Sequence, residues 1–434
     1  MSWHRIAATC VWHKKTNCMK KLIYYFAALI CLAACNAGGD DDGGNGGGGT
    51  QGGGGGTSGT TPTYADTLAS KATYELMQQH SVGNGFPVVL MADGYTKAEI
   101  TSGKYKAAME KAQAALFAIE PMKSLEKYVD VIGVTVPSNE SGVTQKKHDT
   151  ALRTYLASGE DTNVFGDSVA VMGVTWHALI NIYGLTTAEA TQRLNSTLTI
   201  VMPNTDAYKG VTVLYIDKAV KDSIPSGFSL SYVPAYAKAN GVDMFKTLIQ
   251  HEAVGHGIAK LADEYHYGST AVTTKVVADY EEGQRCGFYL NTRYVSPTLG
   301  SAPIYEVGPD SWLYPIKQRD EYSGEDLKWY RGAYVFATAF YRCSDHSIMN
   351  VSNDPLNVTF NVASRAMVYK RVMRVAYGAT WQWDLNSFID FDAPSRQSAA
   401  TAKAKAAYVF TAPSVADIPM LAAPRVVDMK YIAK

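Results

Sequence analysis

The most informative stretch of the chain reads HEAVGHGIAKLADEY over residues 251–265. It holds two imidazoles, His251 and His256, with the carboxylate of Glu252 beside the first, and an acidic pair follows at residues 263–264. Zinc takes neutral imidazole nitrogen and carboxylate oxygen as ligands, and a catalytic site uses three protein ligands and leaves the fourth position to water. A glutamate next to the first histidine accepts a proton from that water in the H-E-x-x-H metalloprotease motif. The stretch therefore predicts an active-site helix that carries a zinc site.

The spacing of the two histidines is one residue longer than in that motif, because the pattern is H-E-x-x-x-H. At about 100° per residue, the two side chains lie roughly 140° apart on a regular helix. A π-type turn brings positions five apart back onto one face, and such turns occur mostly at functional sites. We therefore expect a widened turn at Val254-Gly255. Without it, the two imidazoles are unrelated polar residues on an amphipathic helix.

The third ligand is expected just beyond the helix. Asp263 follows His256 across a turn at residues 257–259, which places its carboxylate within reach of a metal held by the two imidazoles. Glu264 is adjacent, and spacing alone does not choose between them. Tyr265 and His346 are candidates to stabilise the oxyanion of the transition state, with packing or solvent-facing roles as the alternatives.

A polar turn that contains a methionine lies further along, CSDHSIMN over residues 343–350. Metzincin peptidases place such a methionine under the zinc site as an apolar floor. Met349 is therefore expected to form a Met-turn.

Composition excludes some classes of function. The chain has 434 residues, 47% of them hydrophobic, and a formal net charge of zero. That balance is typical of a globular protein and does not indicate nucleic-acid binding. No oligomer is implied.

The N-terminus predicts a lipoprotein. Residues 1–18 are interpreted as an upstream-start extension, and residues 19–34 as a signal peptide with a basic start, a short apolar run and small residues before Cys35. The apolar run is too short to span a bilayer. Cleavage before Cys35 would allow lipid attachment there, and residues 35–63 form a Gly-rich tether. We expect an outer membrane lipoprotein, exposed at the cell surface or, alternatively, facing the periplasm, with only the lipid in the membrane.

Two cysteines remain in the mature chain, Cys286 and Cys343. Two cysteines in an oxidising compartment are expected to form a disulfide. Two free buried thiols are the alternative.

Periodicity predicts an α+β fold. An α/β-like N-terminal lobe over residues 64–257 ends in the active-site helix, and a mainly irregular and helical C-terminal lobe over 258–434 carries the third ligand and the Met-turn. The expected elements are strands at residues 88–91, 129–136, 198–202 and 211–216 in a mixed twisted sheet, and helices at 104–117, 172–182 and 362–377. Residues from about Ser398 are not assigned.

One further strand is expected at residues 228–233, which alternate apolar and polar side chains as an exposed edge strand does. An extended peptide can add to such an edge through main-chain hydrogen bonds. The segment comes shortly before the active-site helix, so we expect it to bind substrate.

Together these features resemble the IgA-peptidase family of secreted bacterial zinc metallopeptidases, a metzincin-like group. The resemblance covers roughly residues 80 to 395 and rests on five segments: LMADGYT at 90–96, GHG at 255–257, KLADEY at 260–265, SIMN at 347–350 and ASRAMVY at 363–369. It implies a metzincin-like fold and endopeptidase activity that depends on one Zn²⁺ per chain. Carried over by position, His251, His256 and Asp263 would bind the zinc, and Glu252 would be the general base.

The chain departs from the family pattern at two places. One is the extra residue between Glu252 and His256, and the other is Ala259, which stands where the metzincin glycine permits a sharp turn. Positive φ is easy for glycine and unfavourable for alanine. Gly257 is the candidate to take over that turn.

The function expected from these observations is that of a cell-surface zinc-dependent endopeptidase. It would hydrolyse peptide bonds of host proteins or glycoproteins through a zinc-bound water, with an extended peptide or glycoprotein as substrate. The alternative is a weakened or inactive metallopeptidase fold on a surface lipoprotein that binds host glycoprotein or peptide. The active peptidase and the inactive binding protein differ in whether the nitrogens of His251 and His256 can both approach one ion.

Overall fold

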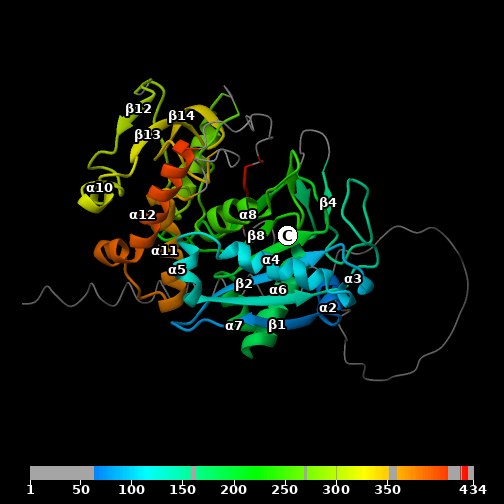
Figure 1. The fold of residues 1–434 in the computed structure, drawn as a ribbon. Helices are drawn as coiled ribbons and strands as arrows, with labels where there is room; N and C mark the ends of the chain where they lie inside the picture. The colour runs from blue at the N-terminus through cyan, green and yellow to red at the C-terminus, as the bar shows by residue number, and fades with distance from the viewer. Residues whose placement is uncertain are drawn as a thin grey trace, which may run out of the picture.

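The computed structural model describes residues 63–157, 163–267, 271–299, 301–350, 359–408, 421 and 423–428, without the side chains of 398–408. The expected signal peptide, Cys35 and nearly all of the tether lie outside these residues. The described chain forms a seven-stranded mixed sheet with helices against it, and a four-stranded sheet at one end (Figure 1). The α+β class is therefore confirmed.

The large sheet has the strand order β1-β3-β2-β6-β8-β7-β15. Strands β3, β2, β6 and β8 run parallel, β1 pairs antiparallel with β3, and β7 pairs antiparallel with β8. The bounds are β1 Thr73–Gln78, β2 Phe86–Asp93, β3 Val129–Thr135, β6 Leu198–Pro203, β7 Val211–Ile216, β8 Ser229–Tyr232 and β15 Arg425–Asp428. The strands expected at 88–91, 129–136, 198–202 and 211–216 are thus confirmed.

Successive side chains of a strand point to opposite faces of a sheet, so β2 supplies two cores. Phe86, Val88 and Leu90 pack in a cluster with the helices α4, η2 and α11, whereas Val89 and Met91 pack in another with α6. The bounds are α2 Tyr64–Ala69, α3 Lys97–Thr101, α4 Lys104–Leu116, α5 Met122–Leu125, η1 Glu126–Tyr128, α6 Ser168–Tyr183, α7 Thr187–Leu194, α8 Phe245–Leu248, η2 Ile249–Ile258, α9 Thr274–Arg285, α10 Tyr314–Lys317, η3 Asp320–Tyr322, α11 Val362–Tyr377 and α12 Leu385–Tyr408. All of β2 is buried, as expected for a strand covered on both faces.

The strand expected at an exposed edge is in fact central. All four residues of β8 are buried, and the strand lies between β6 and β7. The small Ser229 and Ser231 side chains read as polar in the sequence, but they face η2, where Ser229 Oγ donates to Gly257 O at 2.8 Å. The prediction of an exposed edge at residues 228–233 was therefore wrong. Strand β7 lies on the other side of β8 from β6, and β15 follows it at the edge of the described sheet.

The region after the active-site helix contains the smaller sheet, in the order β11-β14-β13-β12, with bounds β11 Thr292–Tyr294, β12 Ile304–Glu306, β13 Lys328–Ala333 and β14 Phe336–Arg342. Two short ladders complete the strands, β4 Tyr155–Leu156 with β5 Val164–Phe165, and β9 Lys238–Ala239 with β10 Val242–Asp243. The helix expected at 362–377 is α11. The unassigned tail contributes the second half of α12, which begins at Leu385, and then β15, which pairs with the large sheet. The division into lobes at residue 257 stays a prediction.

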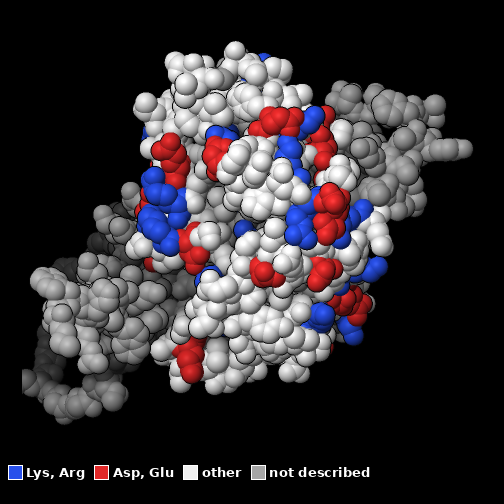
Figure 2. Space-filling view, turned by 90° about the vertical axis from the view of Figure 1, so that its left-hand side faces the viewer, with Lys and Arg blue, Asp and Glu red and all other residues white. Residues whose placement is uncertain are grey.

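The surface carries both signs of charge. In Figure 2, Lys and Arg side chains are interspersed with Asp and Glu over the face in view, in keeping with the zero net charge. Within the described ranges, no single helix combines the length and apolar character of a membrane span, although the bent pair α6 and α7, at 118°, passes that test jointly.

The active-site helix is a π-helix over Ile249–Ile258, which continues directly from α8. The widened turn expected at Val254-Gly255 is confirmed, and it extends over the whole motif. Glycine at 255 is required by close packing, because a Cβ there would lie 2.2 Å from Met349 Sδ. Met349 is itself fully buried, within a core cluster.

A Gly255→Ala substitution should therefore lower the free energy of unfolding by about 1–3 kcal/mol, the usual effect of overpacking. Urea denaturation of both proteins measures this. Gly324→Ala is the control, since a Cβ at Gly324 meets no atom within 4 Å. Equal effects of the two substitutions would contradict the packing described for Met349.

Candidate metal centre

The π-helix brings the two histidines onto one face. The rings of His251 and His256 have centroids 4.8 Å apart and lie nearly perpendicular, at 85°. Both side chains are fully buried. The extra residue in H-E-x-x-x-H is thus absorbed by the i→i+5 geometry of the helix.

Backbone carbonyls fix the orientation of both rings. Nδ1 of His251 lies 2.9 Å from Ile348 O, and Nδ1 of His256 lies 2.8 Å from Leu261 O. A carbonyl only accepts, so each Nδ1 carries a proton, and Nε2 is the ring nitrogen left to face Asp263. Such outer partners are what orient metal-ligating histidines.

Asp263 completes the cluster. Its Oδ1 lies 3.2 Å from Nε2 of His251 and 3.2 Å from Nε2 of His256. Burial alone would raise the pKa of Asp263, but the two imidazoles outweigh it and bring the pKa to about 2. The carboxylate is therefore ionised and faces the Nε2 atoms of both rings.

The donor atoms of this cluster fit a metal ion. One atom from each of His251, His256 and Asp263 lies within 4.8 Å of the others. His256 Nε2 and Asp263 Oδ2 are buried without a hydrogen-bond partner among the described residues. Buried polar groups are normally paired, so unpaired atoms that converge need an explanation such as an ion. Two imidazole nitrogens with a carboxylate oxygen suit zinc.

The neighbouring acid, Glu264, has a different environment. Asn291 Nδ2 donates to Glu264 Oε1 at 2.9 Å, and Asn361 Nδ2 lies 2.9 and 3.0 Å from the two carboxylate oxygens. Burial raises the pKa of Glu264 to about 7. Of the two candidates left open by the sequence, the structure thus places Asp263, and not Glu264, beside the imidazoles.

Glu252 lies between the helix and β7. Thr212 Oγ1 lies 2.9 Å from Glu252 Oε2, whereas Oε1 is buried without a hydrogen-bond partner in the described part of the chain. Gly210 leaves room for the carboxylate, because a Cβ at residue 210 would lie 3.0 Å from Oε1. Burial raises the pKa of Glu252 to about 7, despite the opposing effect of His251.

Met349 lies under the helix, as expected of a Met-turn. Its Sδ faces Gly255, and its carbonyl accepts from Glu264 N at 2.7 Å. The preceding residue, Ile348, supplies the carbonyl that orients His251. This turn therefore supports both the ring and the chain segment that carries Asp263.

The two candidates for oxyanion stabilisation are placed differently. Tyr265 is buried, and its ring stacks on His251 with centroids 6.2 Å apart. Burial raises its pKa well above the usual value, so the hydroxyl stays a donor. His346 instead has an exposed side chain, with Nε2 3.8 Å from Asp345 Oδ2. The structure places it outside the cluster, because the turn directs Ile348 and Met349 inward.

The expected disulfide is not formed. Cys286 and Cys343 are both free and buried, and they belong to different core clusters. Cys286 follows α9 and packs with Tyr280, whereas Cys343 follows β14 and packs in the cluster of Met349. The structure instead contains the alternative, two free buried thiols.

The turn after the helix differs from the expectation as well. Ala259 has φ −89°, so it needs no glycine, and the left-handed residue is Lys260, with φ 54°. Gly257 does not take over the turn. It lies within η2, where a Cβ would come within 2.7 Å of Leu198 Cδ1.

Lys260 is buried, and no carboxylate pairs with it in the part of the chain that the structure describes. Its Nζ donates to Ser229 Oγ and to Gly257 O, and burial together with Arg371 lowers its pKa well below the usual value. Between that lowered pKa and about pH 10.4, the unfolded chain binds one more proton than the folded chain. Raising the pH through this window therefore stabilises the fold.

Relative to a Lys260→Met variant, the wild-type chain should gain about 1.4 kcal/mol of stability per pH unit in that window. Urea denaturation of both proteins at several values between neutral pH and pH 9 gives the difference, in which other titrating groups cancel. Parallel pH dependences would contradict a neutral buried Lys260.

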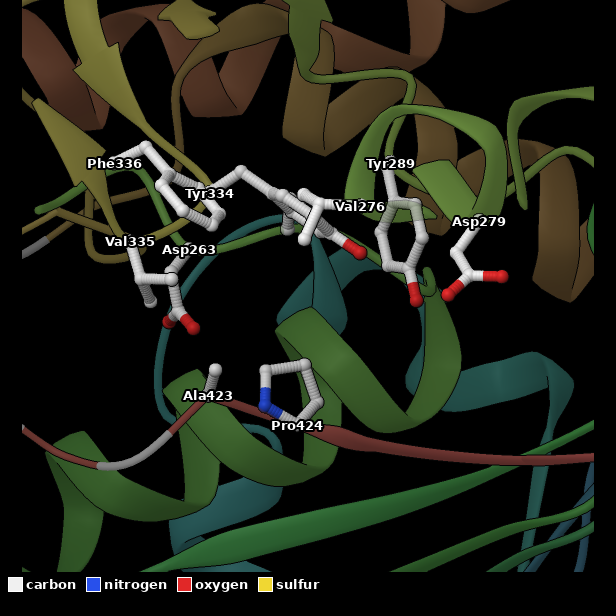
Figure 3. Close-up of a pocket in the computed structure, with 10 residues that line it drawn as sticks. Asp263, Val276, Asp279, Tyr289, Tyr334, Val335, Phe336, Ala423 and Pro424 are labelled. Atoms are coloured by element: carbon white, nitrogen blue, oxygen red, sulfur yellow. The ribbon is translucent and has the colours of Figure 1, made fainter. Parts of the chain in front are cut away.

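A pocket opens beside the cluster, of about 190 Å³. It is lined by Ala262, Asp263, Val276, Asp279, Tyr289, Tyr334, Val335, Phe336, Ala423 and Pro424. Figure 3 shows the Asp263 carboxylate directed toward Ala423, on the segment that leads into β15.

Sequence reasoning missed Thr212, Gly210 and this C-terminal segment. Thr212 and Gly210 lie in and before β7 and carried no motif. The β-branched pair Val426-Val427 after Pro424 is a short strand signal that pointed to β15.

The chain is similar to a known protein family. The model of the family described as IgA Peptidase M64 matches residues 75–282. This range runs from β1 to α9 and includes His251, Glu252, His256 and Asp263. No curated protein matches the chain.

Proposed function

Because residues 75–282 belong to the IgA peptidase M64 family, a family of metallopeptidases, we propose that this protein is a zinc-dependent endopeptidase. The observation that carries the proposal is the convergence of His251 Nε2, His256 Nε2 and Asp263 Oδ1. The metzincin-like character rests on two further features: Met349 beneath the helix, and the sheet whose strand β7 lies beside Glu252.

His251, His256 and Asp263 would hold the zinc. A bound zinc ion supplies Lewis acidity, which polarises a carbonyl and acidifies water. Glu252 would act as the general base and then protonate the leaving amine, since its Oε1 has no partner among the described residues and Thr212 holds Oε2. Tyr265 would donate a hydrogen bond to the developing oxyanion. The Nδ1–H group of each imidazole donates to a backbone carbonyl, which fixes the orientation of the ring.

The substrate is a polypeptide, as the family implies. We propose that it is a host protein or glycoprotein, met at the cell surface by a lipid-anchored enzyme. The signal-like residues 19–34, followed by Cys35 and the Gly-rich run, support this location.

A metal-exchange experiment tests the proposal. The purified full chain is stripped with a chelator and then given zinc, and its cleavage of a mixed peptide library is followed by mass spectrometry. We expect one zinc per chain, loss of cleavage on chelation and recovery on addition of zinc. Binding of zinc without any cleavage would favour the alternative, a peptidase fold that only binds its target.

A further inference from the structure

The C-terminal segment occupies the outer edge of β7. Strand β15 pairs in parallel with β7, with Arg425 opposite Val213 and Asp428 opposite Ile216. In the described sheet β15 is the last strand, so β7 would be the edge without it. An edge strand is where an extended peptide can add through main-chain hydrogen bonds.

This edge lies next to the candidate site. Thr212, which contacts Glu252, sits one residue before the position opposite Arg425. Because the pairing is parallel, the residues before Arg425 run toward the end of β7 that carries Thr212. There Ala423 and Pro424 form one wall of the pocket whose other lining includes Asp263 (Figure 3).

The segment also places a peptide carbonyl among the site's donors. Leu421 O accepts from Tyr265 Oη at 2.7 Å and from Tyr267 Oη. The Leu421 side chain is buried, at 4% exposure. Tyr265 is the residue that stacks on His251, so a main-chain carbonyl of the chain itself is held beside the metal cluster.

We propose that Leu421 and residues 423–428 are an intramolecular ligand of the peptide-binding cleft, held along β7 in the place of a substrate. The segment offers an extended backbone to the edge, a carbonyl to the tyrosines and small residues to the pocket. These are the contacts that a polypeptide substrate needs. The inference rests on the proposed function, since the cleft is that of the peptidase.

The docked segment competes with substrate. The apparent affinity of a site falls by the fraction of molecules in which the site is open. A segment docked in about 99% of molecules would thus raise the apparent KM roughly 100-fold. The attachment is short, and Val426 is 43% exposed, so the segment is held by few buried side chains.

Two substitutions at adjacent positions distinguish the effect of undocking the segment from the effect of adding a charge to it. Val427 packs against the core cluster under the sheet, whereas Val426 faces solvent. Val427→Asp in the full chain should release the segment, and Val426→Asp is the matched control. We expect Val427→Asp to speed hydrogen exchange of the β7 amides and to lower KM for a peptide substrate at least about 10-fold, with Val426→Asp changing neither.

Added peptide completes the test. A synthetic peptide of residues 421–428, LAAPRVVD, should restore β7 protection in Val427→Asp and raise KM competitively. Tyr267→Phe, which removes a donor to Leu421 from outside the segment, should lower KM in the same direction. Faster β7 exchange with unchanged KM, or unchanged exchange, would overturn the proposal. If no variant cleaves any peptide, the proposed function fails, while protection of β7 by the peptide still reports whether the cleft binds it.

Discussion

A Glu252→Gln variant should bind one metal ion per chain and lose about 10²–10⁴-fold in kcat/KM. The glutamine keeps the size of the side chain and its contact with Thr212, so the fold and the three ligands stay in place. It lacks the basic oxygen at Oε1, which is unpartnered among the described residues. The loss in kcat/KM therefore reports the contribution of the Glu252 carboxylate, including its proton transfer.

Elemental analysis of the purified variant and cleavage assays on a defined peptide give the two readings. Glu110→Gln is the control, because Glu110 is exposed on α4 and, among the described residues, its one ion pair is with Lys106 at 3.8 Å. Cleavage at the wild-type rate in Glu252→Gln would remove Glu252 from the mechanism.

An Asp263→Asn variant should lose the metal as well as the activity. The amide is neutral, and its oxygen is a poorer ligand between the two imidazoles. Loss of an outer-shell partner costs about 10–100-fold in metal affinity, and loss of a direct ligand should cost more. Zinc that binds only the folded chain raises its melting temperature, and this rise should disappear in the variant.

Glu264→Gln distinguishes the ligand from its neighbour. Glu264 accepts hydrogen bonds from Asn291 and Asn361, so this substitution should affect stability but leave one zinc bound. Thermal unfolding with and without zinc, for both variants, makes the comparison. Retention of zinc by Asp263→Asn together with its loss from Glu264→Gln would reverse the assignment.

The convergence of His251, His256 and Asp263 could be anticipated from the sequence because its determinants are local. The five-residue separation of His251 and His256 required a π-type turn, and the structure contains one. Asp263 was predicted from its spacing after His256, and Met349 from the polar turn at residues 343–350. Their partners, such as the carbonyl of Ile348, depend only on that same turn.

The errors arose where tertiary contacts decide. Alternation at residues 228–233 suggested solvent on one face, but the serines of β8 face η2 instead. Two cysteines suggested a disulfide, but the fold places them in separate clusters. His346 has a polar sequence environment like that of Ile348 and Met349, and only the path of the turn shows that it points outward. The pairing of β15 with β7 joins segments distant in sequence, so periodicity could not reveal it.

The claim that three residues on and after a π-helix form one zinc site can be tested by diffraction. Crystals of the zinc-loaded protein, measured on both sides of the zinc absorption edge, locate the ion directly. We predict a single anomalous peak at about 2.0–2.2 Å from His251 Nε2, His256 Nε2 and a carboxylate oxygen of Asp263. A peak that lacks any of these ligands, or no peak at this cluster, would contradict it.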